Sequence, residues 1–426
     1  MKKLIFFTNV AIRAIGLLCL VAAAFSQTPQ YDLILKGGHV IDPKNGIDTV
    51  TDVAVRGDRI AALGASLFPS EAKKTIDVSG LYVTPGLIDI HVHVFVGAPA
   101  GIVGGDGDDN VFPDHTCLRL GVTTVVDAGG AGWRTFTVFR RSIIDRSRTR
   151  VLAMVNIVGI GMYLGDEGEQ NPADMDPQKT ADMARKHSDV VVGIKSAHWR
   201  APNFISVEKA VEAGRLADIP VMVDFGYFLP ERPYQVMLLE KLRPGDITTH
   251  FYRWPAPILD DHEKLLPYLA VARRRGVIFD VGHGAGSFYF RQAEPAVKQG
   301  FWPDSISTDL HSGSINYSMI DMLNVMSKFL AMGVPLKEVI RESTTNPATE
   351  IKRPELGQIA PGAAADIAVL RLDRGKFGFV DVRGGRIEGP QRLGCEMTIR
   401  AGRIVFDLNG REGVSWRKAR INYPTR

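Results

Sequence analysis

Histidine, lysine and aspartate recur at the ends of short apolar runs in this sequence of 426 residues. His91 and His93 stand two residues apart, so in a β-strand both imidazoles would leave the same face. Later apolar runs end in Lys195, Asp224, His250 and Asp309. A histidine pair alone is more often a satisfied core pair. Imidazoles and carboxylates converging from several strands, however, are ligands suited to zinc and other divalent metals.

Lys195 ends the apolar run 190–195, and an ammonium beside metal ions would be repelled. Burial lowers the pKa of an amine and leaves it neutral. A neutral amine can take up carbon dioxide to become a carbamate, which is an anionic bridge between two cations. For this strand in isolation, the alternative is a lysine that reaches out to solvent.

The elements that must position these groups alternate along the middle of the chain. Short β-branched runs are separated by longer helical stretches, such as 207–217 and 319–332. Eight such runs end near His93, Asp127, Val158, Lys195, Asp224, His250, Gly282 and Asp309. Eight runs separated by a mean step of about 31 residues predict an α/β fold, the parallel (β/α)8 TIM barrel, which carries its chemistry at the C-terminal strand ends.

Both flanks of this region alternate apolar and polar residues. Residues 31–83 carry glycine-rich turns that predict short antiparallel strands, and the pattern returns in 365–370 and 398–405. Neither flank alone has enough strands to bury a face, so we predict a small β-sandwich domain built from both chain ends. The predicted domains are 27–83 with 352–426 for the sandwich, and 84–351 for the barrel.

Residues 1–26 have the three regions of a secretory signal peptide: a basic start, the apolar run 14–25 and small residues before Gln27. A membrane anchor would need about 18 to 20 apolar residues, and this run is shorter. We therefore expect a secreted or periplasmic protein, with no membrane attachment in its mature form. Its two remaining cysteines, Cys117 and Cys395, could form one disulfide in an oxidising compartment.

Composition and charge narrow the class of protein. The chain is 45% hydrophobic and 23% charged, which excludes collagen, coiled coil and wholesale disorder. Its formal net charge of +4 includes three basic residues within the predicted signal peptide. A nearly neutral mature chain does not indicate a nucleic-acid partner. We expect a small-molecule substrate and a homo-oligomer.

Motifs along nearly the whole mature chain resemble the amidohydrolase superfamily and fall in the order typical of it. They are PGLIDIHVH (85–93), GIK (193–195), TTH (248–250), STD (307–309), NPA (346–348) and GQIAPGAAAD (357–366). The motif FDVGHG (279–284) strengthens the likeness to the dihydroorotase-like deacetylase branch.

The resemblance implies a metal hydrolase with two divalent ions per chain. His91 and His93 would bind the more buried ion, carboxylated Lys195 would bridge the two, and Asp224 and His250 would bind the second. Asp309 would ligate metal and act as the catalytic proton shuttle. Zinc is the first expectation, with manganese or iron as alternatives, and carbon dioxide enters as the lysine carbamate. A metal-bridged hydroxide would attack a polarised carbonyl.

Asp224 departs from the pattern, because the family usually has histidine at the end of the fifth strand. The extra negative charge of this carboxylate should weaken the Lewis acidity of the bound ions and favour harder metals. The alternative roles for Asp224 are to bind a substrate amine or to orient His250. Three further residues are candidates for substrate binding, against a structural role: His283, Gly284 and His198. Asp89 is expected to orient the histidines.

These expectations lead to an exported metal-dependent hydrolase that cleaves an amide, cyclic amide or acyl ester bond of a small molecule. One alternative is a hydrolase of the phosphotriesterase or lactonase type, which shares the metal core. Another is a binding protein that kept the fold and lost turnover. Substrate identity is not readable from the sequence, because specificity lies in the loops after the strands.

Overall fold

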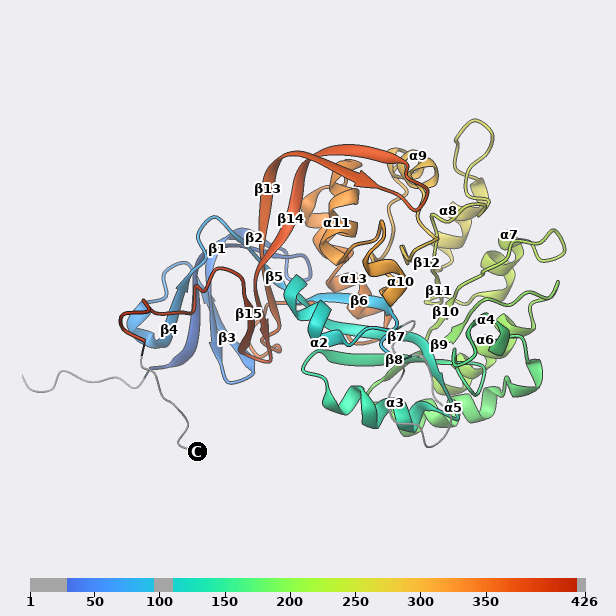
Figure 1. Ribbon diagram of the computed structural model, residues 1–426, viewed down its shortest axis with the longest axis horizontal. Helices are drawn as coiled ribbons and strands as arrows, with labels where there is room; N and C mark the ends of the chain where they lie inside the picture. Colours follow the sequence, from blue (N-terminus) through green and yellow to red (C-terminus); the bar gives the residue numbers. More distant parts are fainter. Residues whose placement is uncertain (1–28, 96–109, 420–426) are drawn as a thin grey trace, which may run out of the picture.

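The computed structural model describes residues 29–95 and 110–419, which form a parallel barrel beside a mixed β-sheet (Figure 1). The predicted signal peptide, residues 1–26, lies outside the described residues. Among the described helices, none combines the length and the apolar character that crossing a membrane requires.

Seven parallel strands form the barrel sheet and pair in chain order. They are β6 (Leu87–Val92), β7 (Val122–Gly132), β8 (Arg150–Asn156), β9 (Val191–Ser196), β10 (Val221–Val223), β11 (Ile247–Thr248) and β12 (Ile278–Phe279). Residues 305–310 close the ring, because Ser305 pairs in parallel with Asp280 after β12, and Leu310 pairs in parallel with Val92 of β6. The predicted eight-step barrel is confirmed, with its eighth position held by isolated bridges instead of a regular strand.

Helices surround the barrel. They are α2 (Pro113–Thr116), α3 (Phe136–Ser142), α4 (Gly165–Gly168), α5 (Pro177–Lys186), α6 (Ile205–Ala217), α7 (Tyr234–Val236), α8 (Pro267–Arg274), α9 (Phe290–Lys298), α10 (Ser312–Ile315), α11 (Met322–Ala331), α12 (Leu336–Arg341) and α13 (Thr345–Glu350). Single helical turns are η1 (Pro69–Glu71), η2 (Cys117–Leu120), η3 (Ile144–Arg146), η4 (Pro172–Asp174) and η5 (Met237–Lys241). Helix α11 begins later than the predicted residue 319, because the Asp321 carboxylate accepts the backbone N–H of Asn324 and caps the helix there.

The second sheet joins strands from both ends of the chain. They are β1 (Tyr31–Asp42), β2 (Ile47–Arg56), β3 (Arg59–Gly64), β4 (Ala72–Asp77), β5 (Tyr82–Pro85), β13 (Ile367–Val380), β14 (Arg386–Arg400) and β15 (Arg403–Asp407). Their order is β15-β14-β13-β5-β1-β2-β3, with β4 also paired to β1. Hydrogen bonds thus join all eight strands in one sheet, and the predicted sandwich of two sheets is not confirmed.

The prediction of antiparallel pairing throughout 31–83 was wrong for two strands. β4 and β5 both run parallel to β1, along its two halves. β2 and β3 occupy the opposite edge of β1, so the chain crosses over before β4, and a crossover gives parallel pairing where a tight turn would reverse the chain.

Contacts between charged groups and backbone tie the sheet to the barrel. The Asp366 carboxylate accepts from Arg150 of β8 at 2.5 Å and from Arg400 of β14 at 3.1 Å. The long strands β13 and β14 extend over the barrel beside α11 (Figure 1), where the Leu393 N–H donates to the Ser327 hydroxyl. Cys117 and Cys395 are buried and not bonded to each other, so the disulfide left open by the sequence is not formed.

Apolar side chains fill the barrel below the strand ends. Ile88, Ile90, Val126, Leu152 and Met222 form one cluster with residues that follow the barrel strands, including Ala348 and Ile351. This packed layer is typical of a barrel interior and leaves the polar chemistry to the C-terminal rim.

Candidate metal centre

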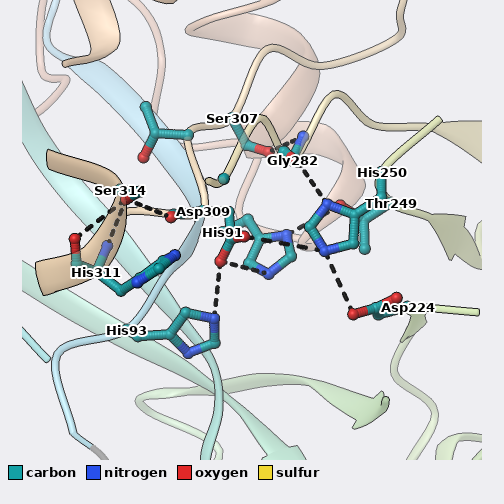
Figure 2. Close-up of polar contacts among 12 residues, drawn as sticks. His91, His93, Asp224, Thr249, His250, Gly282, Ser307, Asp309, His311 and Ser314 are labelled. Atoms are coloured by element: carbon teal, nitrogen blue, oxygen red, sulfur yellow. Dashed lines mark hydrogen bonds and ion pairs between the residues drawn. The ribbon is translucent and has the colours of Figure 1, made fainter. Parts of the chain in front are cut away.

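A cavity of about 250 Å³ opens at the C-terminal ends of the barrel strands. Its lining residues are His91, His93, Phe95, Met162, Gly165, Asp166, Lys195, His198, Asp224, His250, Asp309 and His311. All six predicted metal-binding side chains line this one space, and one of the three predicted substrate contacts, His198, joins them. Figure 2 shows the imidazoles of His91, His93 and His250 gathered around Asp309.

The two histidines of β6 meet Asp309 across the cavity. The Asp309 Oδ1 atom lies 3.0 Å from His93 Nε2 and 3.5 Å from His91 Nε2. Burial opposes ionisation of Asp309, but the imidazoles of His91, His93 and His250 outweigh it and hold the pKa of this carboxyl well below its usual range. Asp309 is therefore a carboxylate, with the charge that a metal ligand needs.

A hydroxyl relay fixes the ring of His91. The Thr249 hydroxyl donates to Asp280 Oδ2 at 2.7 Å, so it accepts from His91 Nδ1–H, which lies 2.9 Å away. Asp280 is fully buried and also accepts from the hydroxyls of Ser305 and Ser307. Because Nδ1 carries the proton, His91 presents Nε2 to the cavity, as a metal-binding imidazole does.

His250 follows β11 and is fixed in a similar way. Its Nδ1–H donates to the Gly282 carbonyl, and its Nε2 lies 3.3 Å from Asp224 Oδ2. The backbone of His250 has φ +60° and that of Asp309 has φ +50°, both in the left-handed region that non-glycine residues seldom adopt. Such strain persists where the surrounding structure imposes it, often at functional sites.

Lys195 lies buried in the wall of the cavity. Its Nζ atom is 3.1 Å from His91 Nε2 and 3.6 Å from the Met222 sulfur, and burial lowers its pKa. Gly129 allows this placement, because a Cβ there would come within 2.7 Å of Lys195 Cγ. The lysine is thus an interior group and does not reach out to solvent.

Asp224 lies between two imidazoles. Its Oδ2 atom is 3.0 Å from His198 Nε2, and its Oδ1 accepts the Gly226 N–H. Burial opposes ionisation of Asp224, but His250 and His198 hold the pKa of the carboxyl well below its usual range. Burial likewise opposes charge on His198, but Asp224 and Glu169 raise the pKa of its imidazole well above normal.

The structure does not bring His283 to the cavity. Its ring is fully buried and stacks on Phe288 with centroids 4.6 Å apart. Its Nδ1–H donates to the Gly284 carbonyl, and its Nε2 accepts from the buried amine of Lys328 at 2.7 Å. Gly284 stands directly behind Asp309, since a Cβ at this position would lie 2.2 Å from Asp309 Oδ2.

Asp89 orients backbone more than imidazole. Its carboxylate accepts hydrogen bonds from the hydroxyl and the N–H of Thr308, and from the N–H of His91 at 3.3 Å. Among the described hydrogen bonds, none joins Asp89 to an imidazole ring. The carboxylate therefore joins the two strands that carry His91 and Asp309.

Sequence reasoning missed several residues that line or support the cavity. His311 stands two residues after Asp309, the same spacing that singled out His91 and His93, and that spacing could have identified it. Asp166 lies in the short helix α4 after β8 and the buried Glu169 directly follows that helix, where no periodic pattern marks them.

The donor set fits divalent ions. His91, His250 and Asp309 each offer a ligand atom, and these atoms lie within 4.8 Å of one another. The Nδ1 atoms of both histidines are already engaged by buried acceptors, which leaves the Nε2 atoms for a metal. Imidazole and carboxylate donors in this arrangement suit zinc and its neighbours.

Known proteins with similar sequences and folds identify the family of this chain. A model of the amidohydrolase family matches residues 290–405. A protein named deacetylase from Agrobacterium fabrum (strain C58) is 33% identical over 341 residues, covering 77% of this chain and 80% of that protein. A solved adenine deaminase superposes with a TM-score of 0.80 and 28% identity, over 88% of this chain and 100% of that chain. A solved dihydroorotase superposes with a TM-score of 0.76 and 28% identity, over 88% of this chain and 99% of that chain. With a barrel of the same kind and a match that spans most of both chains, this protein belongs to the amidohydrolase superfamily.

Proposed function

We propose that this protein is an exported metal-dependent hydrolase that cleaves an amide, cyclic amide or acyl ester bond of a small molecule. The observation that carries the proposal is the convergence of His91, His93, Lys195, His250 and Asp309 on one cavity at the barrel rim. The names of the similar proteins, deacetylase, dihydroorotase and adenine deaminase, support a carbon–nitrogen bond as the target.

Two divalent ions would be held by the chain's own donors. His91 and His93 hold one, Asp224 and His250 hold the other, and Asp309 contributes a carboxylate oxygen. Zinc is the favoured metal, with manganese and iron as alternatives. Bound divalent ions polarise a carbonyl group and make water acidic enough to serve as a nucleophile near neutral pH.

Lys195 would join the two metal sites as a carbamate. Its burial favours the uncharged amine, which is the form that reacts with carbon dioxide. The nitrogen lone pair forms a bond to the carbon of carbon dioxide, one C=O π pair moves to oxygen, and one N–H proton passes to solvent water. The negative charge of the product would lie on the two carbamate oxygens beyond Nζ, the atom that is 3.1 Å from His91 Nε2.

Asp309 would move the proton during hydrolysis. Its carboxylate faces the cavity, with Oδ1 near His93 and Oδ2 held against Gly284. From this position it can accept a proton from the attacking water and return it to the leaving nitrogen or oxygen. Gly284 serves this step by leaving space for the carboxylate.

The dimensions of the cavity support a small substrate. About 250 Å³ lies just below the usual range of about 300–1,000 Å³ for a ligand pocket, and Phe95 and Met162 add apolar surface beside the polar donors. Export rests on residues 1–26 of the sequence. N-terminal sequencing of protein from its native host should find a mature start near Gln27, and a chain retaining Met1 would contradict export.

A substrate panel tests the proposed chemistry. Purified protein should hydrolyse one of four compound classes: N-acyl amino acids, acylated hydroxy acids, hydantoins or dihydroorotate. The Asp309→Asn variant, which keeps the shape of the side chain and removes the base, should lose that turnover. A protein that hydrolyses none of them, or an Asp309→Asn variant as fast as wild type, would contradict the proposal.

A further inference from the structure

His198 belongs to the loop that follows β9, where its ring nitrogens face three carboxylates. Its Nδ1–H donates to Glu169 Oε2 at 2.6 Å and lies 3.3 Å from Asp166 Oδ1, whereas its Nε2 lies 3.0 Å from Asp224 Oδ2. Glu169 is buried, and its other oxygen accepts from the Asn156 amide at 2.6 Å. A buried carboxylate that is itself held in place therefore fixes which nitrogen of His198 faces the cavity.

The backbone around His198 is shaped to bring the ring to Asp224. His198 has φ +52°, and its carbonyl accepts the side-chain amide of Gln170 at 2.8 Å. Gly226 packs so closely against the His198 backbone that a Cβ there would lie 3.0 Å from His198 Cα. The Gly226 N–H holds Asp224 Oδ1, which leaves Oδ2 to face the imidazoles.

Asp224 Oδ2 is the meeting point of two imidazole nitrogens. His250 Nε2 lies 3.3 Å from this oxygen and His198 Nε2 lies 3.0 Å from it. Each ring has its Nδ1–H engaged by a buried acceptor, the Gly282 carbonyl for His250 and Glu169 for His198. A carboxylate bound to the far nitrogen of an imidazole is the usual support of a metal-binding histidine.

We propose that His198 is a ligand of the ion held by Asp224 and His250, with Glu169 as its positioning residue; this rests on the proposed metal-dependent function. The ion would take the place of the proton on Nε2. The site then has two imidazoles and one carboxylate from the protein, where Asp224 and His250 alone would offer only one imidazole. Such a set favours zinc over harder metals.

The competing role for His198 is that of a counterion for Asp166, Glu169 and Asp224 with no contact to metal. The two roles differ in what happens to metal content when the ring is removed. If His198 is a counterion, its removal leaves the ion bound, because Asp224 and His250 remain. If His198 is a ligand, its removal empties the site.

The test measures zinc bound per full-length chain, by elemental analysis and by calorimetric titration of zinc into protein from which metal has been removed with a chelator. Wild-type protein should bind two ions, and His198→Ala should retain the ion at His91 and His93 while losing the other. Glu169→Gln keeps the shape of the residue that supports Nδ1, and it should weaken the same site by about 10- to 100-fold. Trp199→Phe is the matched control, because this neighbour in the loop bonds to Asn203 instead of Asp224, and it should bind two ions like wild type.

The retained ion in His198→Ala reports that the barrel is folded, and Glu169→Gln gives an independent reading without deleting a ring. Two ions of wild-type affinity in both variants would overturn the ligand role and assign His198 to Asp224 as a counterion. Wild-type protein that binds one ion, unaffected by His198→Ala, would overturn it as well. Wild-type protein that binds no ion would refute the proposed function itself, so the two failures are distinguishable.

Discussion

Thr249 offers a sharp test of how the barrel prepares His91 for metal binding. Its hydroxyl accepts from His91 Nδ1–H at 2.9 Å and donates to the buried Asp280 at 2.7 Å. The Thr249→Val substitution keeps the branched shape and removes both hydrogen bonds. His91 Nδ1–H is then left in a buried site without an acceptor, and Asp280 keeps only its bonds from Ser305 and Ser307.

The magnitude follows from these contacts. Leaving a buried donor unsatisfied costs about 1–3 kcal/mol, so the free energy of unfolding of metal-free Thr249→Val should fall by roughly that amount. Loss of an outer partner of a metal-binding histidine typically weakens metal affinity by about 10- to 100-fold. Zinc affinity at the site of His91 should fall within that range.

Ser305→Ala is the matched control. Its hydroxyl also donates to Asp280, at 2.8 Å, but it does not contact a histidine. This variant should lose stability in the same range and keep the zinc affinity of wild type. Competition with a chromophoric chelator measures the affinity, and denaturant unfolding of metal-free protein measures the stability. Wild-type zinc affinity in Thr249→Val, or equal losses of affinity in both variants, would refute the relay.

Further predictions concern the residues around the same cavity. Gly284→Ala should abolish turnover, because its Cβ would lie 2.2 Å from Asp309 Oδ2, whereas Gly286→Ala, with open space around it, should retain wild-type rates in the same hydrolysis assay. Lys195→Ala should lose bound metal and activity, both partly restored by a short carboxylic acid; unchanged metal content would contradict the carbamate bridge. Burial lowers the pKa of Lys328 to about 7, so between pH 7 and the ordinary lysine range the unfolded chain binds the proton that the folded chain does not. The free energy of unfolding should therefore rise by about 2 kcal/mol from pH 7 to pH 9 relative to Lys328→Met, and parallel pH profiles of the two proteins would contradict this.

The barrel and the candidate metal-binding residues at its rim could be predicted because they depend on local patterns. Apolar runs at regular spacing predict parallel strands, and polar residues at their ends predict which side chains meet. His91, Lys195 and Asp309 are far apart in the sequence, yet the topology alone brings them to one cavity. The motifs also follow one another in the order that is typical of the amidohydrolase superfamily.

The supporting contacts could not be predicted, because they depend on tertiary packing between loops. Nothing local to His198 indicates that Glu169 and Asp224 flank its ring, since these residues come from three different loops. His283 looked accessible at the end of a strand, but Phe288 and Lys328 bury its ring behind the wall of the cavity. The single mixed sheet likewise depends on where β4 and β5 return to β1, which the alternation of residues does not encode.

The central claim is that hydrolysis depends on divalent ions held at the rim of the barrel. The most direct measurement is the rate of hydrolysis by wild-type protein before chelation, after chelation and after zinc is restored, with metal content determined on the same samples. The account predicts two ions per chain, loss of turnover when they are removed and recovery when zinc returns. Full turnover in protein shown to be free of metal would contradict it.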